Sequence, residues 1–164
     1  MSSQLQAWLA ARPWGPYRPV VLDFGCGSAE FTRPVAEHLQ PAAIYLVDTD
    51  AISLSEARDE LAAVPGAPEP LCARSLQDMD PPVVRVDLAL MSDVLHHLSA
   101  PEEVLAELIL MLGPGGMLIL RELRRETDGE SPRGLMCRLH ELKAAVDRFC
   151  GLDHGPLLTA PQVE

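Results

Sequence analysis

Aromatic residues are scarce in this sequence: Phe, Trp and Tyr together make up 4% of its 164 residues. The hydrophobic residues, 48% of the chain, must therefore be mostly aliphatic, and they are enough for one folded domain rather than a disordered chain. Such core material is typical of helices packed on a parallel sheet. No apolar run approaches the ~18 residues that a membrane span needs, so we expect no membrane segment.

Positive charge is also in short supply. The chain has 13 Lys and Arg against 24 Asp and Glu, a formal net charge of −11, and its densest basic stretch is the short RELRRE at 121–126. Phosphate neutralisation dominates nucleic-acid affinity, so this balance argues against DNA or RNA as the main partner. We expect the acidity to serve solubility.

Cysteine occurs, but never as a CxxC pair. The chain begins without a charged and then apolar leader, and its four cysteines are Cys26, Cys72, Cys137 and Cys150. Isolated cysteines in a chain without a leader are typical of a reducing compartment. We therefore expect free thiols and a cytoplasmic location.

Two Cys/His pairs imitate the spacing of a zinc site: Cys137 with His140, and Cys150 with His154. A zinc site needs all four side chains to converge. The apolar spacing predicts a helix over 134–149, which would hold the two cysteines about 20 Å apart at ~1.5 Å per residue. We therefore expect no metal.

Apolar runs of β type alternate along the chain with amphipathic helical runs, a pattern typical of repeated βαβ units. The expected strands are 20–24, 43–47, 71–75, 84–91 and 117–121. The expected helices are 3–12, 29–39, 52–63, 101–112 and 134–149. This predicts an α/β fold with three parts: an N-terminal helix and linker (1–18), a Rossmann-like ligand-binding domain (19–123), and a C-terminal helix and tail over the substrate side (124–164).

The stretch VVLDFGCGSAEF at 20–31 bends from strand to helix through Gly25 and Gly27. Such a bend can present backbone N–H groups to a ligand. The fingerprint GxGxxG is incomplete, since Glu30 stands at its third glycine, and a carboxylate there counts against a pyrophosphate and hence against NAD. Asp48, 21 residues beyond Gly27, ends the next strand, where it can accept hydrogen bonds from both hydroxyls of a ribose. The pattern predicts an adenosine-containing ligand without phosphate.

With these motifs the chain resembles the class I S-adenosylmethionine-dependent methyltransferases. The resemblance covers roughly residues 18–123 and rests on four stretches in the family's order: VVLDFGCGSAEFT (20–32), IYLVDTD (44–50), VDLALMSDVLHHL (86–98) and LGPGGMLILREL (112–123). Four ordered motifs are far more specific than one glycine loop. The resemblance implies a sheet of about five strands in the order 3-2-1-4-5 with helices on both faces, S-adenosylmethionine as cofactor, and methyl transfer as the activity.

The resemblance also implies cofactor contacts that run from the methionine end through the ribose and the adenine to the methyl group. In that order the residues are Asp23, Gly25, Cys26, Gly27, Asp48, Thr49, Ser75, Leu76, Met91 and Ser92. Asp23 also has a structural interpretation, as an acceptor for loop groups. Two positions depart from the family pattern: Ala29 replaces a third glycine, and Ser75, with Asp78 three residues later, replaces the acid that often bonds the adenine amino group.

Methyl transfer needs a base only when the acceptor must lose a proton, and His96 and His97 are the candidates for that role. The stretch HELKAAVDRFCGLDH at 140–154 resembles a segment that covers the substrate in some of these enzymes, which implies Asp147 and His154 as pocket residues. We expect a small-molecule acceptor, because the acidity disfavours nucleic acid and the covering segment is small, and a peptide side chain stays open as the alternative.

No β-type run follows residue 123, where the family normally adds strands six and seven. We therefore expect those strands to be missing and the edge of strand five to be exposed, which favours a homodimer or a partner chain. Two other functions stay open: a non-catalytic or partner-dependent S-adenosylmethionine-binding subunit, and an NAD-dependent oxidoreductase, which Glu30 disfavours.

Overall fold

The computed structural model describes residues 9, 17–83 and 85–122. The expectations for 124–164 lie outside these residues, including the 134–149 helix, the missing strands, the zinc-like pairs, Asp147 and His154. Of the expected helix 3–12 only Leu9 is described, and it is helical and completely buried. The chain divides into two compact units, Met1–Ser92 with Ala106–Leu120, and Asp93–Leu105 with Arg121–Glu164.

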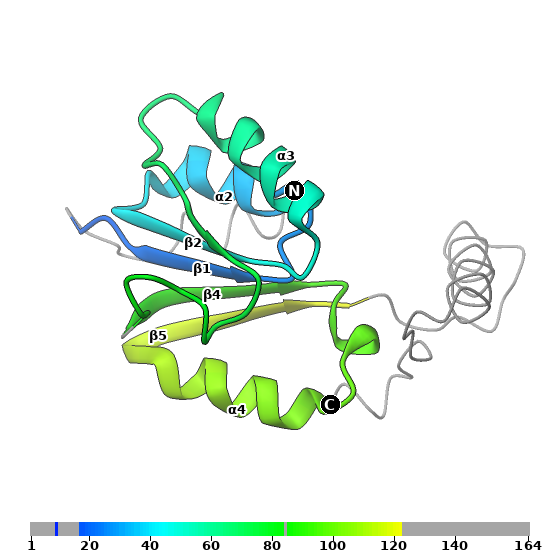
Figure 1. Ribbon diagram of the computed structural model, residues 1–164. Coiled ribbons are helices and arrows are strands. Elements are labelled where there is room, and N and C mark those ends of the chain that lie inside the picture. Colours follow the sequence, from blue (N-terminus) through cyan, green and yellow to red (C-terminus); the bar gives the residue numbers. More distant parts are fainter. Residues whose placement is uncertain (1–8, 10–16, 84, 123–164) are drawn as a thin grey trace, which may run out of the picture. The chain divides into compact units, whose positions relative to one another are not determined.

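The sheet has the predicted topology. Its strands are β1 (Val20–Phe24), β2 (Ala43–Val47), β3 (Leu71–Ala73), β4 (Val86–Ser92) and β5 (Leu112–Arg121), in the order β3-β2-β1-β4-β5 (Figure 1). β1 pairs in parallel with β2 and β4, and β2 pairs in parallel with β3. The fold class predicted from the sequence, a Rossmann-like parallel sheet in the order 3-2-1-4-5, is confirmed.

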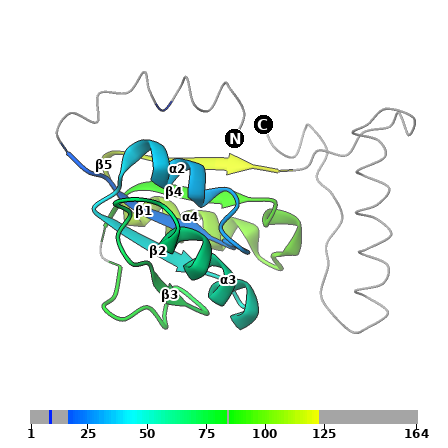
Figure 2. The same cartoon turned by 90° about the horizontal axis from the view of Figure 1, so that it is seen from above.

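The helices are α2 (Thr32–Leu39), α3 (Ala51–Ala62) and α4 (Pro101–Met111), with a short 3-10 turn, η1 (Leu95–His97). Helices α2 and α3 lie on one side of the sheet, and residues 106–111 of α4 lie on the other (Figures 1 and 2). None of the helices in the described ranges combines the length and apolar character that crossing a membrane requires.

Two element boundaries differ from the sequence prediction by three residues or more, for local reasons. The first helix begins at Thr32 rather than residue 29, because Ala29 takes a left-handed φ of 64° that cannot continue into a helix. Strand β5 begins at Leu112 rather than residue 117 and includes the GPGG stretch, which lies between the helix and the strand predicted from the sequence. Pro114 is tolerated there because β5 ends the described sheet, and an edge strand can do without one N–H donor.

The core is aliphatic, as the composition predicts, and it packs in two clusters. Helices α2 and α3 meet β2 through Cys26, Ala29, Ala36, Ile44, Leu46, Leu54, Ala57, Leu61 and Val64. A second cluster gathers Leu9, Val21, Phe31, Val35, Leu88 and Leu90. Strand β4 is buried at five of its seven residues, as expected for a strand inside a parallel sheet covered on both faces.

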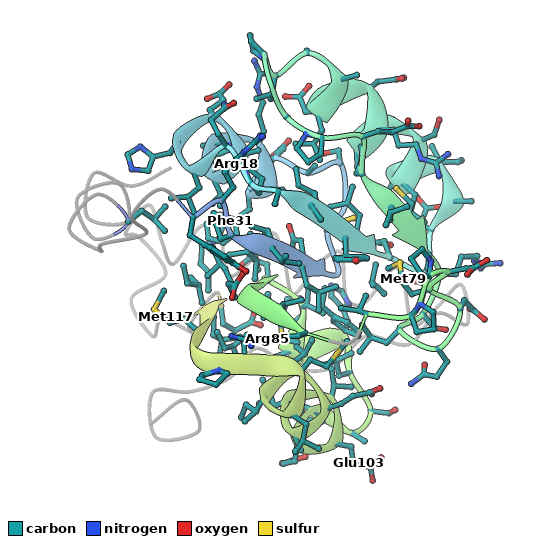
Figure 3. The ribbon with its side chains drawn as sticks, turned by 90° about the vertical axis from the view of Figure 1, so that its left-hand side faces the viewer. Arg18, Phe31, Met79, Arg85, Glu103 and Met117 are labelled. Atoms are coloured by element: carbon teal, nitrogen blue, oxygen red, sulfur yellow. The ribbon has the colours of Figure 1, made fainter. Side chains whose placement is uncertain are left out.

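Two arginines lie at the amino ends of the strands, the end of the sheet that Figure 3 shows. The Arg18 guanidinium donates to the carbonyl oxygens of Gln40, at the end of α2, and of Gly66. Arg85 lies so close to Gly113 that a Cβ at Gly113 would be 1.9 Å from Arg85 Nε. Arg18 thus joins the loops that precede β2 and β3, while the loops at the carboxyl ends of the strands form the candidate site.

Candidate functional site

The candidate site lies within the first unit, where three loops leave the carboxyl ends of the adjacent strands β1, β2 and β3. Open α/β sheets bind ligands at this end. The loop after β1 carries Gly25 and Gly27, the loop after β2 begins with Asp48, and the loop after β3 begins with Arg74. No group of three or more His, Cys, Asp or Glu side chains in the described ranges could hold a metal.

The loop after β1 turns through three left-handed residues: Gly25 (φ 70°), Gly27 (φ 50°) and Ala29 (φ 64°). Glycine adopts this conformation freely, whereas alanine pays roughly 1 kcal/mol for it. Ala29 is completely buried in the core cluster of α2 and α3. A Cβ on Gly27 would meet no atom within 4 Å, so open space lies beside that residue.

The backbone N–H groups of this glycine loop are used inside the protein. Gly25 N and Cys26 N both donate to Val47 O, at 2.7 and 3.1 Å, and Gly27 N donates to Asp48 Oδ2 at 2.8 Å. The sequence led us to expect these amides to face a ligand, and that expectation is wrong for these three. These three amides are therefore not available to bind a phosphate group.

Asp48 connects the loop after β1 to its own loop, the one after β2. Its Oδ2 accepts from Gly27 N at 2.8 Å and its Oδ1 accepts from Asp50 N at 2.9 Å. The side chain is half-buried, and each carboxylate oxygen can accept a second hydrogen bond. The carboxylate is thus held in place at the end of β2 with acceptor capacity for two hydroxyl groups.

Asp23 and Cys26 lie beneath this surface. Asp23 is 1% exposed, and its Oδ2 accepts a hydrogen bond from the hydroxyl of Thr32, the first residue of α2. Burial raises the pKa of the Cys26 thiol, and the carboxylates of Asp23 and Asp48 raise it further. The thiol therefore stays protonated, and its Sγ donates to Gly27 O.

The end of β3 is bonded to the loop after β2. Asp48 N donates to Ala73 O at 3.2 Å, and Arg74 Nε donates to Thr49 O at 3.0 Å. Sequence reasoning missed Arg74, because an arginine after a short strand gives no signal until its partner is known.

The residues expected at the adenine form a turn of their own. The Ser75 hydroxyl donates to Asp78 Oδ2 at 2.7 Å and accepts from Asp78 N at 3.2 Å, while Leu76 is 8% exposed and packs inward. On β4, Met91 is completely buried and Ser92 is half-buried. Their contacts with a cofactor remain predictions.

The two candidate histidines belong to the second unit, and they differ. His96 Nδ1 lies 2.6 Å from Glu122 Oε1, with both side chains almost fully buried, and Leu95 N donates to Glu122 Oε2 at 2.9 Å. His97 is exposed, with its ring centroid 4.1 Å from that of His96. Both histidines lie on η1, and sequence reasoning did not reveal Glu122, which is 26 residues away from His96.

The same unit holds a second, exposed pair, formed by Asp93, three residues before His96, and Arg121, one residue before Glu122. Arg121 Nη2 donates to Asp93 Oδ2 at 2.5 Å, and Asp93 N donates to Arg121 O at 2.8 Å. Asp93 has a left-handed φ of 58°. Residues 93–97 are thus held against residues 121–122 by one buried pair and one exposed pair.

No curated protein matches this chain in sequence. Among solved structures it is similar to a proposed O-methyltransferase from Nostoc punctiforme (TM-score 0.70, 23% identity, 98% of this chain and 46% of that one). It is also similar to an O-methyltransferase family protein from Burkholderia thailandensis (0.68, 18%, 98% and 47%) and to the S-adenosylmethionine-dependent methyltransferase SibL (0.58, 21%, 98% and 46%).

The chain spans slightly less than half the length of each of these three proteins. At such identities the likeness shows the fold, which is that of class I methyltransferases. A family profile described as a methyltransferase domain matches residues 22–118, which is more than half of the chain and includes the loops after β1, β2 and β3. The chain therefore belongs to the methyltransferase domain family.

Proposed function

We propose that this chain binds S-adenosylmethionine and forms the cofactor-binding part of a methyltransferase that acts on a small-molecule acceptor. The observation that carries the proposal is the junction of Asp48 with the glycine loop: an oriented carboxylate at the end of β2, beside a loop whose first three amides are already bonded. This arrangement suits a ribose and disfavours a phosphate.

The charges around the loop support a ligand without phosphate. Asp48 is half-buried beside Gly27, Asp23 is buried beneath the loop, and Glu30 is exposed at its end. Three carboxylates repel an anion but favour a cation, and S-adenosylmethionine carries a positive sulfonium and an ammonium group. NAD carries a pyrophosphate, so the same residues disfavour the oxidoreductase alternative.

In this proposal the glycine loop and Asp48 contact different parts of the ligand. Gly27 leaves open space at its α-carbon, where the methionine end can approach the backbone closely. Asp48 accepts from the ribose hydroxyls with the lone pairs that Gly27 N and Asp50 N do not use. The other predicted contacts, from Asp23, Cys26, Thr49, Ser75, Leu76, Met91 and Ser92, remain part of the proposal.

In methyl transfer an acceptor lone pair forms the new bond to the methyl carbon, while the S–CH₃ bond breaks and its electron pair stays on the sulfur. The protein contributes mainly by orienting the reactants at a separation of roughly 3 Å and by excluding water. Orientation needs a rigid site, and the bonds of the Asp48 carboxylate to the loop after β1 and within its own loop supply that rigidity.

An acceptor that must lose a proton needs a base, and the two histidines are not equivalent for this role. His96 is buried and paired with Glu122, whereas His97 is exposed. We therefore favour His97 as the base and His96 as the residue that holds η1 in place. The proposed roles of Asp147 and His154 at the acceptor stay as the sequence predicts them.

The free thiols of Cys26 and Cys72 support a reducing, cytoplasmic location.

The proposal is tested by measuring ligand-induced thermal stabilisation with S-adenosylmethionine, S-adenosylhomocysteine and NAD. A ligand that binds only the native state raises its melting temperature. We expect stabilisation by the first two and none by NAD. Stabilisation by NAD alone would favour the oxidoreductase alternative. Binding of S-adenosylmethionine without turnover, across a panel of phenol, amine and thiol acceptors, would favour the non-catalytic subunit.

A further inference from the structure

Arg74 is the first residue after β3, and its side chain reaches across to the loop after β2. Its Nε donates to Thr49 O at 3.0 Å, next to the carboxylate-bearing Asp48. The guanidinium also contributes to lowering the pKa of Asp50, after the larger effect of the hydrogen bonds from Ser53 and Ile52. Within the described residues its two Nη groups make no hydrogen bond or ion pair, so up to four N–H donors are available on an exposed side chain.

The order of the strands gives Arg74 a place relative to the ligand. The glycine loop follows β1, Asp48 follows β2, and Arg74 follows β3, in the spatial order β1, β2, β3. A nucleoside whose ribose is bound at Asp48, and whose 5′ substituent lies over the glycine loop, must direct its base away from β1. That direction leads to the end of β3.

The other polar groups at the end of β3 are engaged with one another. The Ser75 hydroxyl donates to Asp78 Oδ2 and accepts from Asp78 N, and Leu76 packs into the core. The residue directly after Arg74 thus offers a hydroxyl rather than a carboxylate. A base in this position therefore lies beside a cation and beside a serine hydroxyl that is already bonded.

We propose that Arg74 is a further cofactor-binding residue and that it recognises the purine by donating hydrogen bonds to it. This inference rests on the proposed function. A carboxylate would accept from the 6-amino group of adenine and would repel the 6-oxo group of hypoxanthine. A guanidinium has the opposite preference, because it donates to a 6-oxo group and N7 together, as arginine does with guanine.

The site should therefore not require adenine as the purine base of its ligand. The site binds S-inosyl-L-homocysteine, which carries hypoxanthine, at least as tightly as S-adenosyl-L-homocysteine. Isothermal calorimetry of the full chain with both compounds tests this. Arg74→Met removes the donors at similar volume, Arg74→Lys keeps the charge without the fork, and Arg58→Met on the exposed face of α3 removes one charge elsewhere as a matched control.

In the wild type we expect the dissociation constant of the inosyl compound, divided by that of the adenosyl compound, to be one or less. Arg74→Met should weaken the binding of the inosyl compound about tenfold or more, which is the scale of a hydrogen bond to a charged group. It should weaken the binding of the adenosyl compound less. The affinities of Arg74→Lys should fall between those of the wild type and those of Arg74→Met. Arg58→Met should change the affinity for neither compound.

If Arg74 only holds the Thr49 carbonyl, Arg74→Met weakens both compounds equally and the ratio stays constant, which overturns the inference. A wild-type ratio above ten, in favour of adenine, overturns it as well. Failure of the wild type to bind either compound is a different result, because it overturns the proposed function itself.

Discussion

Gly27 and Asp48 are joined by a hydrogen bond from the backbone amide of Gly27 to Oδ2 of Asp48, 2.8 Å long. The bond attaches the loop after β1 to the end of β2, and the Asp50 amide holds the other carboxylate oxygen. One side chain thus fixes the shape of the loop and points an acceptor toward the ligand. Asp48 should therefore affect both stability and binding.

Asp48→Ala is expected to weaken the binding of S-adenosylhomocysteine by about 1–3 kcal/mol, because acceptors for two ribose hydroxyls are lost. Asp50 is the matched control: it is exposed, and it caps α3 by accepting from the amides of Ile52 and Ser53. Asp50→Ala should lower the unfolding free energy by about 1 kcal/mol without changing affinity. Calorimetry and urea denaturation of both variants separate these effects. Unchanged affinity in Asp48→Ala would contradict the ribose assignment.

Gly27→Ala and Gly115→Ala form a second matched pair. Both glycines have a left-handed φ, 50° and 77°, and a Cβ at either would meet no atom within 4 Å. Each substitution should lower the unfolding free energy by about 1 kcal/mol through backbone strain alone. Only Gly27→Ala should also weaken the binding of S-adenosylhomocysteine, by at least tenfold, because the methyl group of the new alanine enters the space proposed for the ligand. Equal affinities in the two variants would show that the ligand does not approach Gly27.

The buried Cys26 thiol should make stability fall at alkaline pH. Burial raises its pKa in the folded protein, while in the unfolded chain it ionises near its ordinary value of 9.0. The folded state therefore binds more protons than the unfolded state above about pH 9, and the unfolding free energy decreases there by up to ~1.4 kcal/mol per pH unit. Urea denaturation between pH 8 and pH 10 measures this slope. Cys26→Ala should reduce it and Cys72→Ala should not, and the same slope in both variants would refute the assignment.

The buried pair of His96 and Glu122 should contribute far more to stability than the exposed pair of Asp93 and Arg121. The two side chains of the first pair are 1% and 2% exposed, and those of the second are 41% and 57% exposed. Glu122→Ala should lower the unfolding free energy by about 3 kcal/mol, because it leaves His96 and the Leu95 amide without this acceptor. Arg121→Ala should cost less than about 1 kcal/mol. Comparable losses in chemical denaturation would show that Glu122 is not buried in solution.

The edge of β5 should favour association, as the sequence suggests. β5 ends the sheet of the described residues, and the nearby Leu110 and Ile109 of α4 are 85% and 57% exposed. Light scattering over a dilution series should show a mass that rises with concentration. Leu120→Lys on β5 should suppress this rise, and Ile52→Lys on α3 should not. A monomer of constant mass in the wild type would contradict the prediction.

The sequence predicts much of this fold because its local signals agree with the tertiary structure. β1 and β2 were predicted at 20–24 and 43–47 and observed at the same residues, since apolar runs bounded by glycine and acidic residues leave little choice. The sequence prediction excludes the GPGG stretch from β5 because proline and glycine usually end a strand. Its position at the edge of the described sheet removes the need for the missing donor.

By itself, the sequence determined the order of the elements, the glycine bend and the acid at the end of β2, all of which depend on neighbouring residues. Only the tertiary structure decided how these groups are used: that the amides of Gly25 and Cys26 bond to Val47, that Arg74 reaches Thr49, and that Glu122 is the partner of His96. These partners lie more than 20 residues apart along the chain. Strand order and register bring them together, and a hydrogen bond forms only where donor and acceptor meet within about 3 Å.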